Sequence, residues 1–220
     1  MTMTLHGYWR SSASYRVRLA ANLKGLAYDQ ISYDLRRGEQ AMPALRRMAP
    51  LALVPVLEVD GIGLSQSLAI LEWLEETHPE PPLLPAAAME RATVRAMAAI
   101  IACDIHPLNN LRVLQTLRHQ LGASEQAVQD WIGRWIRDGF AALETMVGEH
   151  GRGFCFGDSP TIADCCLIPQ IYNARRYHVD LTDFPQLCAV ETRCAELEAF
   201  VRALPDRQPD AGGATDSGRA

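Results

Sequence analysis

Three hydroxyl side chains fall within Arg10-Ser11-Ser12-Ala13-Ser14-Tyr15-Arg16-Val17-Arg18, at the boundary between a strand-like run and a helix-like run. The residues before it, Thr4 to Tyr8, predict a short strand, and apolar residues at helical spacing from Val17 predict a helix that Gly25 ends. Unpaired backbone N–H groups and the positive end of the helix dipole favour an anion at such a start. The simpler interpretation is that one serine caps the helix while the other hydroxyls contact water.

A predicted β-hairpin followed by a second polar cluster favours the anion-site interpretation. Two apolar runs flank Asp60-Gly61 within Val54-Pro55-Val56-Leu57-Glu58-Val59-Asp60-Gly61-Ile62-Gly63-Leu64, and this dipeptide is a strong hairpin-turn signal. Ser65-Gln66-Ser67 comes next and opens a helix-like stretch that continues through Leu74. With a further strand expected from Tyr28 to Leu35, the order is strand, helix, strand, hairpin, helix, which is typical of a thioredoxin-like domain.

The cysteines exclude dithiol chemistry at the first helix. Thioredoxin-like oxidoreductases carry Cys-x-x-Cys there, whereas this chain has serines and no cysteine before Cys103. A thiol that reacts at this position must therefore arrive on a ligand. We expect buried free thiols in a reducing compartment from the six cysteines, which are Cys103, Cys155, Cys165, Cys166, Cys188 and Cys194. Cys103 and His106 could share a helix face, but two ligands alone make a weak site, so we predict no zinc or other metal.

Composition and charge narrow the functional class. The chain has 220 residues, of which 48% are hydrophobic, enough to bury the core of one large or two small domains. We expect no membrane-spanning segment and no signal peptide, and therefore a cytoplasmic protein without a membrane partner. The net charge of −5 and the lack of a basic run argue against a nucleic-acid partner, so a small molecule is the expected ligand.

A proline-rich segment divides the chain into two predicted domains. Pro79-Glu80-Pro81-Pro82-Leu83-Leu84-Pro85 has the composition of a stiff linker, and strand signals end there. We expect a thioredoxin-like α/β domain over residues 1–80, a linker over 81–88, an all-helical domain over 89–205 and a disordered polar tail over 206–220.

Helical patterns fill the second predicted domain. The expected helices are, in chain order, Ala88 to Ile105, Glu125 to Val147, one starting near Thr161, Pro169 to Tyr177, and Pro185 to Leu204. Thr161-Ile162-Ala163-Asp164 is a capping-box pattern, in which a threonine and an acid three residues later satisfy backbone N–H groups of the first turn. We interpret this motif as a stabilising element without a catalytic role.

The combination of motifs resembles the zeta-class glutathione transferases. The segments that carry the resemblance are Ser11 to Arg18, Val54-Pro55, Gln66-Ser67-Leu68-Ala69-Ile70, Asn173-Ala174-Arg175-Arg176-Tyr177 and Val179-Asp180-Leu181-Thr182, and together they extend over most of the chain. The serine-rich motif is specific to the class, whereas Val-Pro and Gln-Ser occur across most glutathione transferases. The resemblance implies the glutathione transferase fold, in which a thioredoxin-like domain binds glutathione and a helical domain completes the substrate pocket, usually in a homodimer.

The resemblance also implies roles for individual residues in binding glutathione. Ser11 resembles the serine that hydrogen-bonds the glutathione sulfur, and Gln66 with Ser67 would hold the γ-glutamyl carboxylate. Val54 would pair its backbone with the cysteinyl backbone of the tripeptide, and the bond to the following Pro55 is expected to be cis. The other implied contacts around the ligand are Ser12, Ser14, Gln40, His106, Asn110 and Arg112.

Substrates of the class carry two carboxylates, so arginines are expected beside the thiol. Arg176 matches the family arginine that grips a substrate carboxylate, and Arg10 is the other first choice. Arg175 is expected to form a surface salt bridge. Many family members have cysteine where this chain has Ala13, which leaves thiolate stabilisation to Ser11 and the helix end.

The activity implied by the resemblance is glutathione-dependent cis–trans isomerisation of a maleyl diketo acid. Maleylacetoacetate, converted to fumarylacetoacetate in aromatic amino acid breakdown, is the first candidate, and maleylpyruvate of gentisate breakdown is the nearest alternative. A glutathione-dependent dehalogenase or conjugating transferase is a further alternative. A non-catalytic binding module ranks last, because such a protein would be expected to lose the serine motif or Gln66-Ser67, and both are intact.

Overall fold

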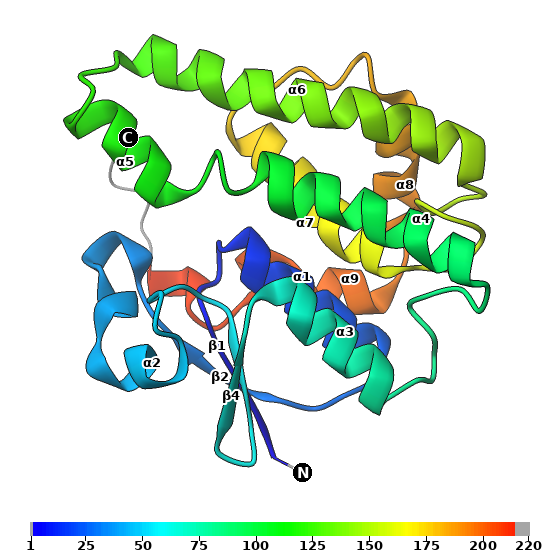
Figure 1. Ribbon diagram of the computed structural model, residues 1–220, viewed down its shortest axis with the longest axis horizontal. Helices are drawn as coiled ribbons and strands as arrows, with labels where there is room; N and C mark the ends of the chain where they lie inside the picture. Colours follow the sequence, from blue (N-terminus) through cyan, green and yellow to red (C-terminus); the bar gives the residue numbers. More distant parts are fainter. Residues whose placement is uncertain (1, 214–220) are drawn as a thin grey trace. The chain divides into compact units, whose positions relative to one another are not determined.

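The computed structural model describes residues 2–213 and divides the chain into two compact units (Figure 1). Among the described residues, the first unit combines 2–82 with 196–213, and the second spans Leu83–Ala195. The boundary after residue 82 falls inside the predicted proline-rich linker. The second unit ends at residue 195, whereas the sequence predicts a helical domain that extends to residue 205. The difference arises because the last α-helix, over residues 198–203, groups with the unit that contains the sheet.

A four-stranded mixed sheet forms the centre of the first unit. Its strands are β1 (Met3–Gly7), β2 (Asp29–Ser32), β3 (Val56–Val59) and β4 (Ile62–Ser65). They lie in the order β2-β1-β3-β4, with β1 parallel to β2 and β3 antiparallel to both of its neighbours. The predicted hairpin is confirmed, since β3 and β4 are joined by Asp60 and Gly61, whose φ angles are 47° and 86°. Positive φ at both turn positions is the reason for the Asp-Gly preference.

The strand directions bring three chain segments to one edge of this sheet. His6 of β1 pairs with Val56 of β3, and Val56 pairs in turn with Ser65 of β4. Because β3 runs opposite to its neighbours, the end of β1, the start of β3 and the end of β4 lie at the same edge. The two predicted polar clusters follow β1 and β4, so both occur at this edge.

Helices cover both faces of the sheet in the first unit. On one side, α1 (Ser12–Leu23) packs beside α3 (Ser67–Thr77) and also contacts α9 (Glu198–Ala203). The short helix α2 (Pro43–Met48) lies on the other side of the sheet (Figure 1). The buried apolar cluster around α2 consists of Tyr33, Leu45, Ala49 and Val56.

The end of the described chain corrects the prediction of a disordered tail. Residues 205–213 contain two short 3-10 helices. Gln208 is buried, and the carboxylate of Asp210 accepts a hydrogen bond from the backbone N–H of Trp9 at 2.9 Å. These contacts offset the conformational entropy that a polar segment loses on ordering. The remaining part of that prediction, residues 214–220, lies outside the described residues.

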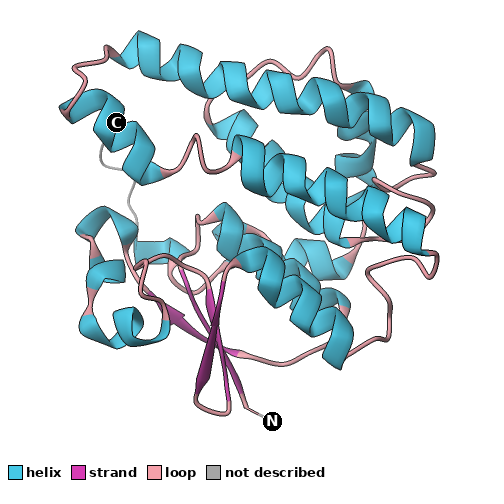
Figure 2. Cartoon of the chain, in the orientation of Figure 1, coloured by secondary structure: helices cyan, strands magenta, loops and turns pink. Residues whose placement is uncertain are grey.

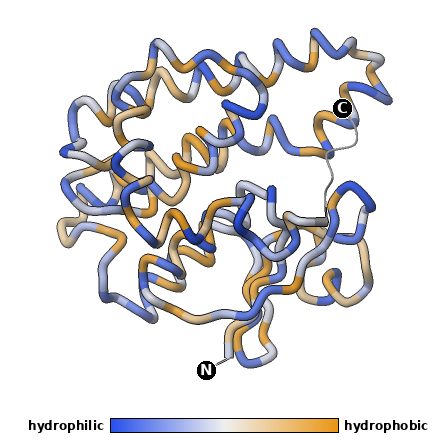
Figure 3. Tube along the Cα trace, turned by 180° about the vertical axis from the view of Figure 1, so that it is seen from behind, coloured by the Kyte–Doolittle hydropathy of each residue, from blue (hydrophilic) through white to orange (hydrophobic). Residues whose placement is uncertain are grey.

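The second unit consists of helices and connecting loops (Figure 2). Its helices are α4 (Ala88–Ala99), the π-helical η3 (Ile100–Ile105), α5 (Leu111–His119), α6 (Glu125–His150), α7 (Ile162–Arg176) and α8 (Pro185–Ala195). Along α6, hydrophobic residues recur among hydrophilic ones (Figure 3). The side chains that this spacing buries are Val128, Ile132, Ile136, Phe140, Leu143 and Val147. The periodicity that predicted α6 is therefore the pattern of its packing face.

Helix boundaries in this region differ from the predictions at three places. α7 runs unbroken through Pro169, where the sequence predicts two helices, and its residues from Ile162 to Ile171 are all buried. Packing along such a helix outweighs the backbone hydrogen bond that proline removes. The predicted helix from Pro185 to Leu204 is interrupted, because α8 ends at residue 195 and α9 begins at residue 198. The sequence reasoning missed α5, which begins after the cap Asn110.

Candidate active site

One edge of the sheet brings together the two polar clusters of the first unit. α1 begins there after its cap Ser11, and α3 begins there with Ser67. The two helices are joined by a buried hydrogen bond in which Arg16 Nη1 donates to Ser67 Oγ at 3.1 Å. Each helix start carries backbone N–H groups and partial positive charge. This edge is therefore the candidate site for an anionic ligand.

Ser11 is the N-cap of α1 and is only partly buried. Its Oγ accepts a hydrogen bond from the backbone N–H of Ser14 at 3.2 Å. A serine hydroxyl accepts and donates at the same time, so the Ser11 proton remains available to an acceptor such as a sulfur anion. The simpler interpretation, that one serine caps the helix, is confirmed for Ser11, and it leaves room for the second role.

The other two serines of the motif do not contact water as the simpler interpretation expected. Ser12 is 7% exposed and Ser14 is fully buried. A Cβ atom at Gly7 would lie 3.0 Å from Ser14 Oγ, so a larger residue there would crowd the close approach of α1 to the end of β1. The Ser14 hydroxyl has no hydrogen-bond partner in the described part of the chain. The contact between Ser14 and glutathione that the resemblance implies stays a prediction.

The Val54–Pro55 peptide bond is cis, as expected. Val54 is partly buried and packs against the apolar cluster around α2. It lies just before β3, outside the strand pairs, so its backbone N–H and C=O are not used by the sheet ladder. Backbone groups in this position can pair with an extended peptide, as an added strand does.

Gln66 and Ser67 form the start of α3. Gln66 is exposed and has φ 72° and ψ 112°, an uncommon backbone conformation for a residue other than glycine. Its side chain makes no capping hydrogen bond, so the first N–H groups of α3 lack a side-chain cap. Strained residues of this kind cluster at ligand sites, which is in line with the role expected for the pair.

Gln40 and Arg10 are also in the first unit. Gln40 lies in the 3-10 helix η2 (Glu39–Ala41), and its buried Oε1 has no hydrogen-bond partner among residues 2–213. Arg10 is partly buried, and its guanidinium lies 5.2 Å from the ring centroid of Trp9, a cation–π contact.

The other four predicted ligand contacts belong to the second unit. His106 follows η3 and is partly buried, Asn110 caps α5 by accepting from the Arg112 N–H at 3.2 Å, and Arg112 itself is exposed. Arg176 ends α7, is exposed, and stacks on the Tyr177 ring with 4.4 Å between guanidinium and centroid. All four are thus carried by a different unit from the serines and the Gln66-Ser67 pair.

The expectation for Arg175 is confirmed. Its guanidinium pairs with both carboxylate oxygens of Glu191 on α8, and the Nε–Oε1 distance is 3.0 Å. The side chain of Arg175 is 55% exposed, so this is a surface ion pair.

Every cysteine is a free thiol, as expected, but not every one is buried. Cys103 is exposed and Cys188 is partly buried. Burial raises the pKa of Cys155 and of Cys194, and the nearby Asp164 carboxyl raises both pKa values further. Buried thiols held in the protonated form are poor nucleophiles, so these two have no place in the chemistry. Within residues 2–213, no group of three or more histidines, cysteines or acids is placed to hold a metal ion.

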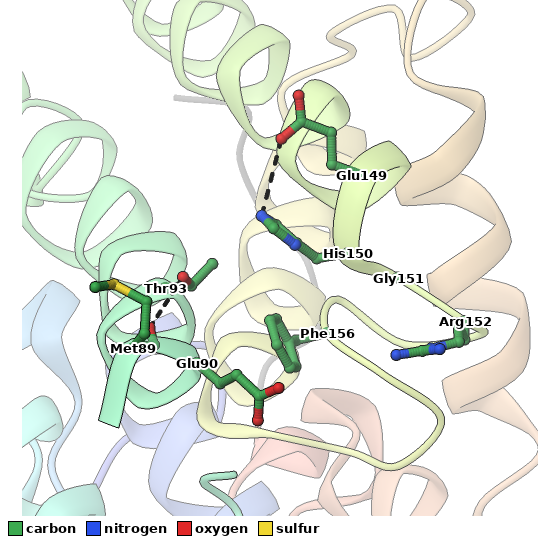
Figure 4. A pocket seen from close by; sticks show the side chains of 8 residues that line it. All are labelled: Met89, Glu90, Thr93, Glu149, His150, Gly151, Arg152 and Phe156. Carbon is green, nitrogen blue, oxygen red and sulfur yellow. Dashed lines mark hydrogen bonds and ion pairs between the residues drawn. The ribbon is translucent and has the colours of Figure 1, made fainter. Parts of the chain in front are cut away.

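A pocket of about 440 Å³ lies within the second unit (Figure 4). It is lined by Met89, Glu90, Thr93, Glu149, His150, Gly151, Arg152 and Phe156, and none of these is a predicted site residue. The His150 and Phe156 rings are stacked at 5.5 Å between centroids.

Within residues 2–213, no helix has both the length and the apolar character that a membrane span needs.

Sequence reasoning missed Arg16 as a site residue. It belongs to the quoted serine-rich motif, but a charged residue within a helix is usually expected to face solvent. The structure instead leaves it 2% exposed and in contact with the start of α3. The available signal was its position one turn before Ala20, on the apolar face of the helix.

Known proteins resemble the chain over nearly its whole length. The glutathione S-transferase N-terminal domain family matches residues 10–77, and the C-terminal domain family matches residues 125–203. A maleylpyruvate isomerase from Ralstonia sp. is 49% identical over 211 residues, covering 94% of this chain and 99% of that protein. A holo structure of a maleylpyruvate isomerase, described as a bacterial zeta-class glutathione S-transferase, superimposes with a TM-score of 0.92 at 48% identity, covering 94% of this chain and 99% of that one.

A maleylacetoacetate isomerase from Anaeromyxobacter dehalogenans 2CP-1 supplies a liganded comparison. Its structure with glutathione bound in the active site has a TM-score of 0.87 at 48% identity, covering 96% of this chain and 98% of that one. A further structure of that enzyme holds dicarboxyethyl glutathione and citrate in the active site. The match of both domain families, together with identity near one half along the whole chain, establishes that this protein belongs to the zeta class of the glutathione S-transferase family.

Proposed function

We propose that this chain is a glutathione-dependent cis–trans isomerase of maleyl diketo acids. Maleylacetoacetate is the first candidate for its substrate, and the product would then be fumarylacetoacetate. The observation that carries the proposal is the near full-length identity to isomerases of this kind, at 48–49%. The candidate site agrees with it, because two helix starts and an unpaired backbone segment meet at one edge of the sheet.

Glutathione would bind along this edge in an extended form. The γ-glutamyl carboxylate would lie at the start of α3, where Gln66 and Ser67 and the uncapped N–H groups are donors. The cysteinyl backbone would pair with that of Val54, as in the addition of a strand. The thiol would then lie at the start of α1, beside Ser11. Ser12, Ser14 and Gln40 are proposed as further contacts.

Ser11 and the α1 dipole would activate the thiol. A free thiol has a pKa near ~8.5 and is mostly protonated at neutral pH. One hydroxyl hydrogen bond together with a helix N-terminus can lower this pKa by about one to two units. The Ser11 proton is free to donate because its oxygen already accepts from the Ser14 N–H.

The thiolate then adds to one carbon of the cis double bond, and the electron pair of that bond moves into the conjugated carbonyl as an enolate. The former double bond is now a single bond and rotates. Collapse of the enolate re-forms the double bond in the trans geometry and expels the thiolate. Glutathione is regenerated, so no net group transfer occurs and glutathione acts as a cofactor.

The two substrate carboxylates would be held by arginines. Arg176 is exposed, and its Nη2 donates to the Tyr177 hydroxyl. It makes no ion pair in the described part of the chain comparable to that of Arg175, so its remaining N–H groups are donors for a carboxylate. Arg10 is adjacent to Ser11 and is the proposed second cation, with His106, Asn110 and Arg112 as further ligand contacts.

A second candidate substrate is maleylpyruvate. It is favoured by a specific observation, the 49% identity to the Ralstonia maleylpyruvate isomerase. Both acids present a cis double bond conjugated to a carbonyl and two carboxylates, so the same chemistry applies to each. Which acid is turned over faster decides between them.

The test is to follow isomerisation of each acid by NMR, with glutathione, without it, and with S-methylglutathione. The proposal expects cis-to-trans conversion only with glutathione, because the methylated analogue binds but has no thiolate to add. Faster turnover of maleylpyruvate than of maleylacetoacetate would assign the second candidate. Conversion without glutathione, or none of either acid with it, would contradict the proposal.

The proposal also includes the oligomeric state and the cellular location of the protein. We expect a homodimer, because the glutathione transferases that the chain resembles are usually homodimers. Analytical ultracentrifugation over a range of concentrations checks this, and a monomer at micromolar concentration would contradict it. A cytoplasmic role in aromatic amino acid breakdown is proposed on the basis of the substrate and the free thiols.

A further inference from the structure

A buried arginine adjoins the proposed carboxylate subsite. Arg16 on α1 is 2% exposed, and its Nη1 donates to Ser67 Oγ at 3.1 Å. Ser67 is itself 7% exposed and is the first residue of α3. An anion bound at the start of α3 would therefore meet Ser67 with a positive charge directly behind it.

The hydrogen bond sets the polarity of the Ser67 hydroxyl. A guanidinium only donates, so the Ser67 oxygen must be the acceptor of this bond. The single Ser67 proton is then left to donate to another group. The neighbouring N–H groups at the start of α3 are donors as well, since Gln66 provides no side-chain cap. The subsite thus offers donors and a positive charge.

Geometry places the charge close enough to act on a ligand. A ligand oxygen in hydrogen-bond contact with Ser67 Oγ lies within about 6 Å of Arg16 Nη1. Both side chains are buried, so water screens this interaction less than it would at the surface. A carboxylate gains from that charge, whereas a neutral carboxamide of the same shape does not, and its NH₂ group faces only donors.

We propose that Arg16 is the residue that makes this subsite select a carboxylate, by polarising Ser67 and by its own charge. This inference rests on the proposed function and deepens it. Arg16 does not contact the reacting thiol, so it is a specificity-determining and positioning residue. The expected signature is a change in ligand discrimination and in the KM for glutathione, with kcat at saturating glutathione nearly unchanged.

The test uses calorimetric titration of the full chain with two ligands. One is glutathione, and the other is its analogue in which the γ-glutamyl α-carboxylate is a carboxamide. The wild type should prefer glutathione by about a hundredfold, as expected for loss of a hydrogen-bonded charge. Arg16→Gln keeps a donor near Ser67 but removes the charge, and should reduce this preference by about tenfold or more. Arg16→Lys should restore part of it.

Arg18 is the matched control on the same helix. It is 1% exposed and donates to the backbone carbonyls of Trp9 and Ala203, away from Ser67. Arg18→Gln therefore removes an equally buried charge and should lower stability while leaving the preference at the wild-type value.

The outcomes separate the inference from the proposed function. A wild type that binds no glutathione contradicts the proposed function, whatever the variants do. A wild-type preference retained in Arg16→Gln, or equal weakening of both ligands, overturns the inference and leaves the function standing. If Arg16→Gln does not fold, Ser67→Ala decides, because Arg16 remains there: the preference should fall yet stay above about tenfold, and its complete loss would show that Arg16 contributes nothing.

Discussion

At the scale of single residues, the serine motif combines a structural and a chemical task in one side chain. Ser11 caps α1 through its oxygen, and the proposed function has its proton donated to the glutathione thiol. Removing its hydroxyl therefore affects both stability and the bound sulfur, and the two effects need separate measurements.

We expect Ser11→Ala to raise the pKa of the bound glutathione thiol by about one unit and to slow turnover near neutral pH, because the thiolate loses its donor. The measurement is thiolate absorbance of bound glutathione against pH. Ser124→Ala is the control, since Ser124 caps α6 with the same 3.2 Å bond and losing it should cost about 1 kcal/mol without moving the thiol titration. A titration moved by Ser12→Ala and not by Ser11→Ala would assign the role to the other serine.

The neighbouring arginines at the end of α7 should differ in function. Arg176→Ala is expected to raise the KM for the maleyl acid by about tenfold or more, with the KM for glutathione unchanged, because a carboxylate partner is lost. Arg175→Ala should stay near wild type, because its surface ion pair with Glu191 contributes about 1 kcal/mol at most. Steady-state kinetics on both variants at saturating glutathione check this. Damage in Arg175→Ala alone would mean that the helix presents the other arginine to the substrate.

At the scale of elements, the start of α7 is held by the predicted capping box. Thr161 Oγ1 accepts from the Ala163 N–H at 3.2 Å, and Asp164 accepts from the Thr161 N–H at 2.7 Å. The same carboxylate also accepts from the Cys155 N–H at 2.8 Å and ties the preceding loop to the helix. Asp164 is fully buried, so this is a network inside the second unit and not a surface cap.

Asp164→Asn should lower the free energy of unfolding by about 2–3 kcal/mol, because an amide cannot accept all the bonds that the carboxylate accepts. Burial raises the pKa of Asp164 above its ordinary value of 3.8. For a raised folded-state pKa, the stabilisation is fully present below the unfolded pKa and is lost as pH rises through the folded pKa. The deficit of the variant shrinks as pH rises above the ordinary value of 3.8, so it should be smaller at about pH 7 than at about pH 4. Urea unfolding at both pH values measures it, and a deficit that grows with pH would contradict the assignment.

At the scale of the whole molecule, Lys24, which is the only lysine of the sequence, links three segments of the first unit. Lys24 Nζ lies 2.8 Å from Glu75 Oε2 and donates to the carbonyls of His78 and Pro81 at 2.6 Å and 3.0 Å. The end of α1, the end of α3 and the start of the linker are thus held by one buried cation. Its side chain has no exposed surface, and that of Glu75 is 8% exposed.

Lys24→Met should cost about 3–5 kcal/mol of stability, because it leaves the Glu75 carboxylate buried without its partner. The double variant Lys24→Met/Glu75→Leu should recover a large part of this loss. As a comparison, Arg118→Ala breaks an ion pair with Glu125, whose side chain is 66% exposed, and should have little effect on stability. Denaturant unfolding measures all three. A double variant as unstable as Lys24→Met would refute the proposed cause.

Local signals in the sequence determined much of this fold. The Asp60-Gly61 turn, the Ser11 cap, and the Thr161-Asp164 box each act over a few residues, so their chemistry is readable without knowledge of distant contacts. The order of strands and helices followed from the spacing of apolar residues along the chain. The cis bond at Val54–Pro55 and the roles of the ligand contacts came from the family resemblance, since no local pattern specifies them.

Only the tertiary structure decided which side chains meet across long stretches of chain. Arg16 and Ser67, like Lys24 and Glu75, are 51 residues apart, and each pairing depends on how α1 packs beside α3. Packing also carries α7 through Pro169 and joins residues 196–213 to the sheet-containing unit. Whether a charged side chain is buried and paired depends on how several elements pack together. A prediction made from one helix at a time therefore places a charged residue on the solvent-facing side and a polar C-terminal segment in a disordered tail.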